Sequence, residues 1–151
     1  MAILIFKDMK RYFIYLLCAL VFLAGCDKPV VPQPDPQLPV TFTNTSGDWI
    51  LDTWEGNDMS SAQIYLRLKN KEFVMWQSVN SMYPVKYTGT YNITEIEGTG
   101  FVIRGMYDYT YEYWQHQYVI SSLTSDTMEW TSLDNPADVS VYRRTDAFPK
   151  E

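Results

Sequence analysis

The chain has 151 residues, which is enough for one globular domain and too few for two. Hydrophobic residues make up 46% of it, as in ordinary folded proteins, and its formal net charge is −6. An acidic surface repels phosphate backbones, so the composition argues against nucleic acid as a partner.

The first recognisable element is an apolar run at 12–24 that follows Lys10 and Arg11. Its length is typical of the core of a signal peptide and is too short to span a bilayer. We therefore predict a signal peptide over residues 1–25. Met9 is an alternative start, because Met9 and the two basic residues would begin a compact signal. A membrane anchor that happens to end in a cysteine is the competing interpretation.

The apolar run ends in "LAGC", residues 23–26, which resembles the lipobox of bacterial lipoproteins. Small residues before the cysteine let the backbone enter a signal peptidase, and the thiol of Cys26 then takes the lipid. Acylation supplies two or more chains, which anchor a protein stably in a bilayer. We therefore predict that Cys26 is lipidated.

Processing at this cysteine would change both the thiol content and the charge of the mature chain. Cys18 would leave with the signal peptide, and no thiol would remain for a disulfide, a nucleophile or a zinc site. The mature chain would carry nine basic against seventeen acidic residues, a formal charge of −8.

Residues 27–40, "DKPVVPQPDPQLPV", contain five of the eight prolines of the chain. Proline fixes φ and removes an amide donor, so we expect an extended spacer that joins no packed core and reaches roughly 40 Å. The predicted organisation is a signal peptide at 1–25, a lipidated cysteine and linker at 26–41, a folded domain at 42–146 and a tail at 147–151.

From residue 41 onward the hydrophobic pattern has a period of two, as in "QIYLRLK" (63–69), "VKYTGTYNI" (85–93) and "VSVYRR" (139–144). Strict alternation is typical of half-buried antiparallel strands, and no window has a helical pattern. Turn residues divide the segment into eight predicted strands at 48–54, 62–69, 72–78, 84–94, 100–107, 112–121, 126–132 and 138–144.

The links between these strands differ in length. Those at 70–71, 95–99 and 122–125 are short, whereas those at 55–61, 79–83, 108–111 and 133–137 are longer. Alternate links of an up-and-down meander lie at the same end, so the longer ones share one rim. Closure removes exposed strand edges, and we therefore predict an all-β, eight-stranded up-and-down antiparallel barrel.

Gly47-Asp48-Trp49 matches the G-x-W motif that opens the first strand of lipocalins. Over residues 44–146 the chain resembles the lipocalin-like (calycin) domains of Bacteroidetes lipoproteins, and "TGTYNI" (88–93) and "SDTMEW" (125–130) resemble recurrent phrases of these domains. The resemblance implies that Trp49 plugs the closed end and that a basic residue of the last strand packs over it. Arg143 and Arg144 are both candidates for that role.

The same resemblance bears on location. Bacteroidetes lipoproteins sent to the cell surface often carry an acidic cluster after the cysteine, whereas this chain has Asp27 followed by Lys28. We therefore expect a lipid-anchored protein of the cell envelope, on the periplasmic side of the outer membrane.

An aromatic run, "MYDYTYEYWQHQYVI" at 106–120, surrounds the only histidine of the chain. We expect a chain reversal at 108–111, because a single strand of that length would be exceptional. Beyond the reversal, one face of the predicted strand is the more apolar and is placed inside; it carries Trp114, His116, Tyr118 and Ile120. The other face carries Tyr113, Gln115, Gln117 and Val119.

Two interpretations of this run remain open. The residues could simply fill the barrel, as in many small barrels. Alternatively, they could line a pocket for a small ligand, with the aromatic rings apolar and His116 as a polar group. The candidate ligand-binding residues are then Trp114, His116, Tyr118 and, at the rim, Tyr109, Tyr111, Met82, Tyr83 and Met59.

Catalysis and metal binding have less support. His116 has no identifiable nucleophile or orienting group, and a lone histidine is more often a hydrogen-bonded core residue. Carboxylates occur in or beside the rim links, at Glu55, Asp58, Asp108, Asp134 and Asp138, without the spacing of a calcium loop. We predict no catalytic residue, no metal site, no cofactor and no enzymatic activity.

The leading functional prediction is a membrane-tethered lipocalin-like lipoprotein that binds a small apolar ligand through the open rim. The alternative is a protein-interaction module with a side-chain-filled barrel, such as a periplasmic inhibitor of lysozyme-like enzymes or an accessory of an envelope complex. An empty apolar interior would distinguish the first from the second.

Overall fold

The computed structural model describes residues 35–78 and 83–150, which belong to one compact unit, Asp35–Glu151. One helical turn, α2 (Phe42–Thr45), precedes the strands. The strands are β1 (Gly47–Trp54), β2 (Asn57–Asp58), β3 (Tyr65–Lys69), β4 (Glu72–Gln77), β5 (Val85–Ile96), β6 (Gly100–Tyr107), β7 (Tyr118–Leu123), β8 (Thr127–Ser132) and β9 (Val139–Arg144). No helix in the described part of the chain is long and apolar enough to cross a membrane.

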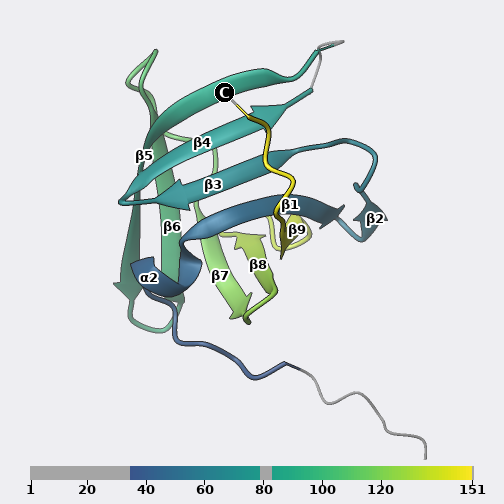
Figure 1. Ribbon diagram of the computed structural model, residues 1–151. Coiled ribbons are helices and arrows are strands. Elements are labelled where there is room, and N and C mark those ends of the chain that lie inside the picture. Colours follow the sequence, from purple (N-terminus) through teal and green to yellow (C-terminus); the bar gives the residue numbers. More distant parts are fainter. Residues whose placement is uncertain (1–34, 79–82, 151) are drawn as a thin grey trace, which may run out of the picture. The chain divides into compact units, whose positions relative to one another are not determined.

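The strands form a closed antiparallel barrel (Figure 1). β1 and β3 to β9 each pair with the next strand in this series, and β9 returns to pair with β1. The short β2 pairs only with the end of β1 and lies outside the ring. The predicted eight-stranded up-and-down barrel is therefore confirmed. The strand pairings and core of the described residues fall within Asp35–Glu151, and residues 35–151 are therefore the segment used in the experiments below.

Local backbone geometry explains the tight turn between β3 and β4. Asn70 and Lys71 have φ values of 53° and 65°, both in the left-handed region. Two such residues form the type I′ turn that matches the twist of a hairpin. The predicted two-residue link at 70–71 is confirmed.

The predicted strand at 112–121 is wrong over its first half, because β7 begins only at Tyr118. Between β6 and β7 the ladder holds two residue pairs, and Tyr113 forms an isolated bridge to Met106. The indole of Trp114 lies so close to Gly105 that a Cβ there would overlap it, and Trp114 N donates to Gly105 O at 2.8 Å. This packing holds residues 112–117 against the barrel as an irregular segment.

Smaller differences concern the ends of the barrel. The strand predicted from residue 62 begins at Tyr65, after Gln63 with a φ of 52°. Neither β2 nor α2 was expected. The spacer prediction is wrong at its end, since Leu38 and Val40 pack against the core and Leu38 N donates to Leu123 O at 2.7 Å.

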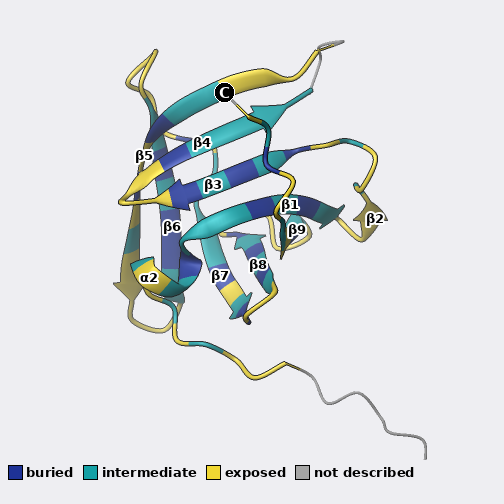
Figure 2. Cartoon of the chain, viewed as in Figure 1, coloured by how far each residue is buried: buried dark blue, intermediate teal, exposed yellow. Residues whose placement is uncertain are grey.

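The core fills the barrel toward the end where α2 lies (Figure 2). Side chains that are less than 2% exposed there include Trp49, Leu66, Leu68, Phe73, Leu123 and Met128, and these six come from five strands. Burial of such side chains is the main stabilising term of a domain of this size. This end of the barrel is therefore a packed plug, and any interior space must lie toward the other end.

Candidate functional site

A cavity of about 420 Å³ occupies the open end of the barrel, within the range of small-ligand pockets. It lies among the strand ends that adjoin the predicted rim links. Its lining residues are Leu51, Trp54, Met59, Ile64, Met75, Gln77, Tyr107, Trp114, Gln115, His116, Tyr118, Trp130, Asp138, Ser140 and Tyr142.

Aromatic rings form one continuous side of this cavity. They come from β6, the segment after it, and β7, β8, β9 and β1, which are neighbours around the barrel. The ring of Trp130 is central, with centroids of Tyr142, Tyr118 and Trp114 at 4.8, 5.6 and 5.8 Å. Pairs at such distances interact favourably beyond their buried area. The facing side supplies Met59 and Ile64 from the β1–β3 link and Met75 and Gln77 from β4.

The two central tryptophans present carbon rather than nitrogen to the cavity. Trp114 and Trp130 are 5% and 2% exposed, and their Nε1 atoms are buried without a hydrogen-bond partner among the described residues. These N–H groups are therefore closed to a ligand in the cavity, and the small part of each indole that is exposed is carbon. The aromatic wall is therefore an apolar, π-rich surface.

Polar groups lie at the mouth of the cavity. Trp54 Nε1 donates to Asp138 Oδ1 at 2.8 Å. His116 Nδ1 lies 2.8 Å from Asp134 Oδ2, and Ser132 Oγ donates to Asp134 Oδ1 at 2.6 Å. The hydrogen bonds from Ser132 and then from His116 lower the pKa of Asp134 below its ordinary value.

The tyrosines of the wall are held neutral. Burial raises the pKa of Tyr118 to about 12, and the negative charge of Asp138 adds to the effect. The pKa of the Tyr142 phenol is also raised, first by burial and then by Tyr118 and Asp138. The raised pKa values of Tyr118 and Tyr142 indicate that negative charge is disfavoured in this cavity.

The structure brings together four of the predicted ligand-binding residues: Trp114, His116, Tyr118 and Met59 all line the cavity. Tyr83, Tyr109 and Tyr111 do not belong to the lining and are 75%, 63% and 79% exposed. Met82 lies outside the described residues.

Sequence reasoning missed several lining residues, above all Trp54, Trp130 and Tyr142. The signal was present in the alternation, since Trp130 is an inward position of β8 and Ser140 and Tyr142 are inward positions of β9. In β9 apolar character does not identify the inward face. The buried residues are Ser140 and Tyr142, whereas Val139 and Val141 lie on the opposite face.

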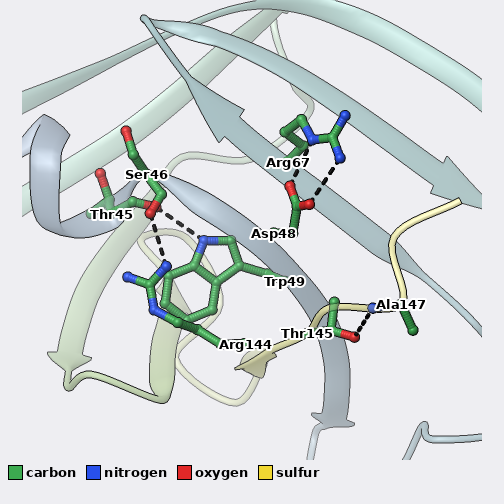
Figure 3. Close-up of polar contacts among 8 residues, drawn as sticks. All are labelled: Thr45, Ser46, Asp48, Trp49, Arg67, Arg144, Thr145 and Ala147. Carbon is green, nitrogen blue, oxygen red and sulfur yellow. Dashed lines mark hydrogen bonds and ion pairs between the residues drawn. The ribbon is translucent and has the colours of Figure 1, made fainter. Parts of the chain in front are cut away.

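The G-x-W segment is built into the opposite, closed end (Figure 3). Trp49 is fully buried, and its Nε1 donates to Thr45 O at 3.0 Å. The guanidinium of Arg144 lies 4.1 Å from the ring centroid of Trp49. It also donates to the backbone oxygens of Ser125, Asn44 and Ser46 at 2.6, 2.8 and 2.9 Å.

Arg144 is thus the basic partner of Trp49, and Arg143 is not. Arg143 instead donates to Asp52 at 3.3 Å, with about half of its side chain exposed. Gly47 has a φ of 141°, and a Cβ at this position would overlap the guanidinium of Arg144. Glycine is therefore required here for two reasons, conformation and space.

A second hollow, of about 720 Å³, lies outside the barrel at the closed end, beside Asp48, Arg67 and Arg144. Arg67 holds Asp48 through two hydrogen bonds of 2.6 and 2.8 Å (Figure 3). The ring of Phe148 from the C-terminal tail covers the same guanidinium at 4.0 Å. Although larger, this hollow is a polar surface depression in which Asp48, Arg67 and Arg144 are already engaged, so the barrel cavity is the better candidate site.

Within the described residues, no group of three or more histidine, cysteine, aspartate or glutamate side chains is placed to hold a metal ion. The Ser132–Asp134–His116 cluster also lacks the order of a catalytic triad, because the serine bonds the carboxylate and not the imidazole.

Comparison with known proteins gives one similarity of fold. No protein-family model matches the chain, and no curated protein matches it. Among solved structures, a lipocalin-like protein from Bacteroides uniformis superimposes with a TM-score of 0.49 and 11% sequence identity. The superposition covers 68% of this chain and 99% of the other.

Proposed function

We propose that the chain is a binding protein that takes a small, largely apolar ligand into the open end of its barrel. The observation that carries the proposal is the cavity of about 420 Å³ above a closed end that is packed with side chains. A barrel that served only as a scaffold would be expected to fill its interior throughout. Here the packing stops partway along the barrel.

The energetics are compatible with useful affinity. A ligand that buries about 300 Å² of apolar surface gains roughly 7 kcal/mol from transfer out of water. That gain alone corresponds to a Kd of about 10 μM, and association costs offset part of it, so a Kd between about 10 μM and 1 mM is expected. The stacked rings around Trp130 are already in contact with one another, which limits the cost of ordering them on binding.

Uptake of the neutral dye N-phenyl-1-naphthylamine by residues 35–151 tests this proposal. We expect saturable fluorescence enhancement. Ser140→Leu should weaken it several-fold, because Ser140 lines the cavity and the added carbons occupy its space. Val141→Leu is the matched control, since the next residue of β9 takes the other face of the barrel. Absence of uptake, or equal effects of the two substitutions, would contradict the proposal.

A protein-interaction role is the second candidate, and the exposed tyrosines favour it. Tyr109, Tyr111 and Tyr113 follow β6 within five residues of one another and are 63%, 79% and 55% exposed. Aromatic side chains are enriched where proteins meet. Inhibition of a lysozyme by residues 35–151, lost in the Tyr109→Ser/Tyr111→Ser variant, would support this role. Unchanged lysozyme activity would count against the inhibitor form of it.

The tether is a further part of the proposal and concerns residues outside the described range. The basic residues, the apolar run and "LAGC" support lipidation of Cys26 and attachment to a bacterial membrane, on the periplasmic side of the outer membrane. Radiolabelled palmitate should enter the full-length chain and not its Cys26→Ser variant. A labelled variant would refute Cys26 as the acceptor.

Binding, rather than catalysis, is the activity that we assign to this cavity. His116 is engaged by Asp134, and the lining residues supply rings, thioethers and amides more than reactive groups. No nucleic-acid partner is proposed, in keeping with the acidic composition.

A further inference from the structure

We infer that the ligand carries a positive charge: it is an organic cation, such as a quaternary ammonium or a protonated amine, with an apolar body. The inference rests on the proposed function, because it assigns a ligand class to the same cavity. The combination that points to it is an aromatic wall, a carboxylate at the mouth and, among the described lining residues, no basic side chain other than one paired histidine.

The aromatic wall suits a cation. Six of the fifteen lining residues are tryptophan or tyrosine, and they come from β6, the segment after it, and the adjoining strands from β7 round to β1. Rings of these two types attract cations through the negative face of the π system, most strongly where water is excluded. Because the Nε1 atoms of Trp114 and Trp130 are buried, these rings offer no N–H donors to an anionic or carbonyl-bearing ligand. The two methionines of the facing side, Met59 and Met75, add polarizable sulfur.

The charged groups of the lining also favour a cation, because they are negative rather than positive. Asp138 is its only carboxylate, and no lysine or arginine of the described residues lines the cavity. One oxygen of Asp138 accepts the indole N–H of Trp54, which fixes the carboxylate beside an aromatic ring at the mouth. The imidazole of His116 is also in the lining, and the carboxylate of Asp134 lies 2.8 Å from its Nδ1. Fixed negative charge therefore faces an entering ligand.

The buried tyrosines of the wall show how far the charge of Asp138 acts into the cavity. The charge of Asp138 contributes to the raised pKa of both Tyr118 and Tyr142, after burial in each case and, for Tyr142, after Tyr118. The same potential that opposes a phenolate opposes a carboxylate ligand, so a fatty-acid anion is disfavoured. A cation of the same size gains from it.

Three compounds of similar size and shape separate charge from apolar burial. Benzyltrimethylammonium is the cation, neopentylbenzene is its uncharged carbon analogue, and 4-tert-butylbenzoate is an anion. Each is titrated against residues 35–151 loaded with N-phenyl-1-naphthylamine. We expect the dissociation constant of the cation, measured by displacement of the dye, to be about tenfold lower than that of neopentylbenzene. This difference is within the range of combined cation–π and charge effects. The anion should bind most weakly.

Two variants with the same change of net charge test the role of Asp138. Asp138→Asn removes the charge at the mouth and keeps an oxygen that can accept from Trp54. Its affinity for benzyltrimethylammonium should fall about fivefold or more, with little change for neopentylbenzene. Glu97→Gln, in the β5–β6 turn at the other end of the barrel, is the control and should change neither. Added salt should weaken binding of the cation alone, which provides a test that needs no substitution.

The outcomes distinguish this inference from the proposal on which it rests. Equal or tighter binding of neopentylbenzene, or of the benzoate, would overturn the cation assignment and leave the binding function intact. An equal loss of affinity for benzyltrimethylammonium in Asp138→Asn and Glu97→Gln would overturn the role of Asp138 in binding the cation. Failure of the dye and of all three compounds to bind would refute the proposed function itself.

Discussion

The contact between Arg144 and Trp49 makes the sharpest prediction about stability, because the neighbouring Arg143 supplies a control. Arg144→Met keeps an unbranched side chain over the indole and removes the guanidinium. The change abolishes three charge-assisted hydrogen bonds to backbone oxygens and one cation–π contact. It leaves the oxygens of Asn44 and Ser46, at the end of α2, without these donors.

The size of the effect follows from these contacts. Hydrogen bonds to charged groups contribute about 1.5–3 kcal/mol, and partial exposure of Arg144 justifies about 1 kcal/mol for each. The cation–π contact adds about 0.5–1 kcal/mol, and packing of the methionine offsets part of the sum. We therefore expect the free energy of unfolding to fall by about 3 kcal/mol. A domain of this size is stable by only about 5–15 kcal/mol in all.

Urea denaturation of residues 35–151, followed by tryptophan fluorescence, measures this loss. Arg143→Met should cost less than about 0.5 kcal/mol, because its single bond to Asp52 is long and exposed. Equal losses in the two variants, or a larger loss for Arg143→Met, would refute the assignment of Arg144 as the partner that holds the closed end together.

Further predictions concern the segment at 112–117 and the buried tyrosines. Gly105→Ala should destabilise the barrel by about 1–3 kcal/mol, since its Cβ would overlap the indole of Trp114. In a Trp114→Phe background the same substitution should cost less, because the smaller ring leaves room for the Cβ. An equal cost in both backgrounds would contradict the overlap. The free energy of unfolding should also fall between about pH 10 and 12, because the unfolded state releases the Tyr118 proton near pH 10 while the folded state holds it to about 12. Tyr118→Phe should flatten that slope in urea melts across this range, and an unchanged slope would contradict the raised pKa.

Much of the barrel is encoded in local patterns. Alternation of side chains with period two places strands such as β3 and β8, and a link of only two residues, Asn70 and Lys71, requires a tight hairpin turn of type I′. The longer links then fall at one end because consecutive antiparallel strands leave no other arrangement. Such features depend on residues close together in the chain.

What sequence reasoning could not supply depends on contacts between distant segments. Arg143 and Arg144 are the same residue type, and only the register of β9 on β1 pairs Arg144 with Trp49, on a shared face of the sheet. Likewise, the irregular path after Tyr111 follows from packing of Trp114 on Gly105, which no alternation pattern displays.

The candidate site shows the same division. Trp114, His116 and Tyr118 were predicted from an aromatic run, whereas their neighbours in space, Trp130 and Tyr142, lie on other strands. Whether the interior holds space depends on how far the side chains from all eight strands reach across the barrel, which is a property of the assembled core.

Native mass spectrometry of residues 35–151, purified gently from an expression host, tests the central claim most directly. We expect an additional mass that is lost on denaturation, or, if the protein emerges empty, a one-to-one complex when benzyltrimethylammonium or N-phenyl-1-naphthylamine is added. A protein that emerges empty and stays empty with both compounds would contradict a ligand-binding cavity and turn attention to the exposed tyrosines as a protein-binding surface.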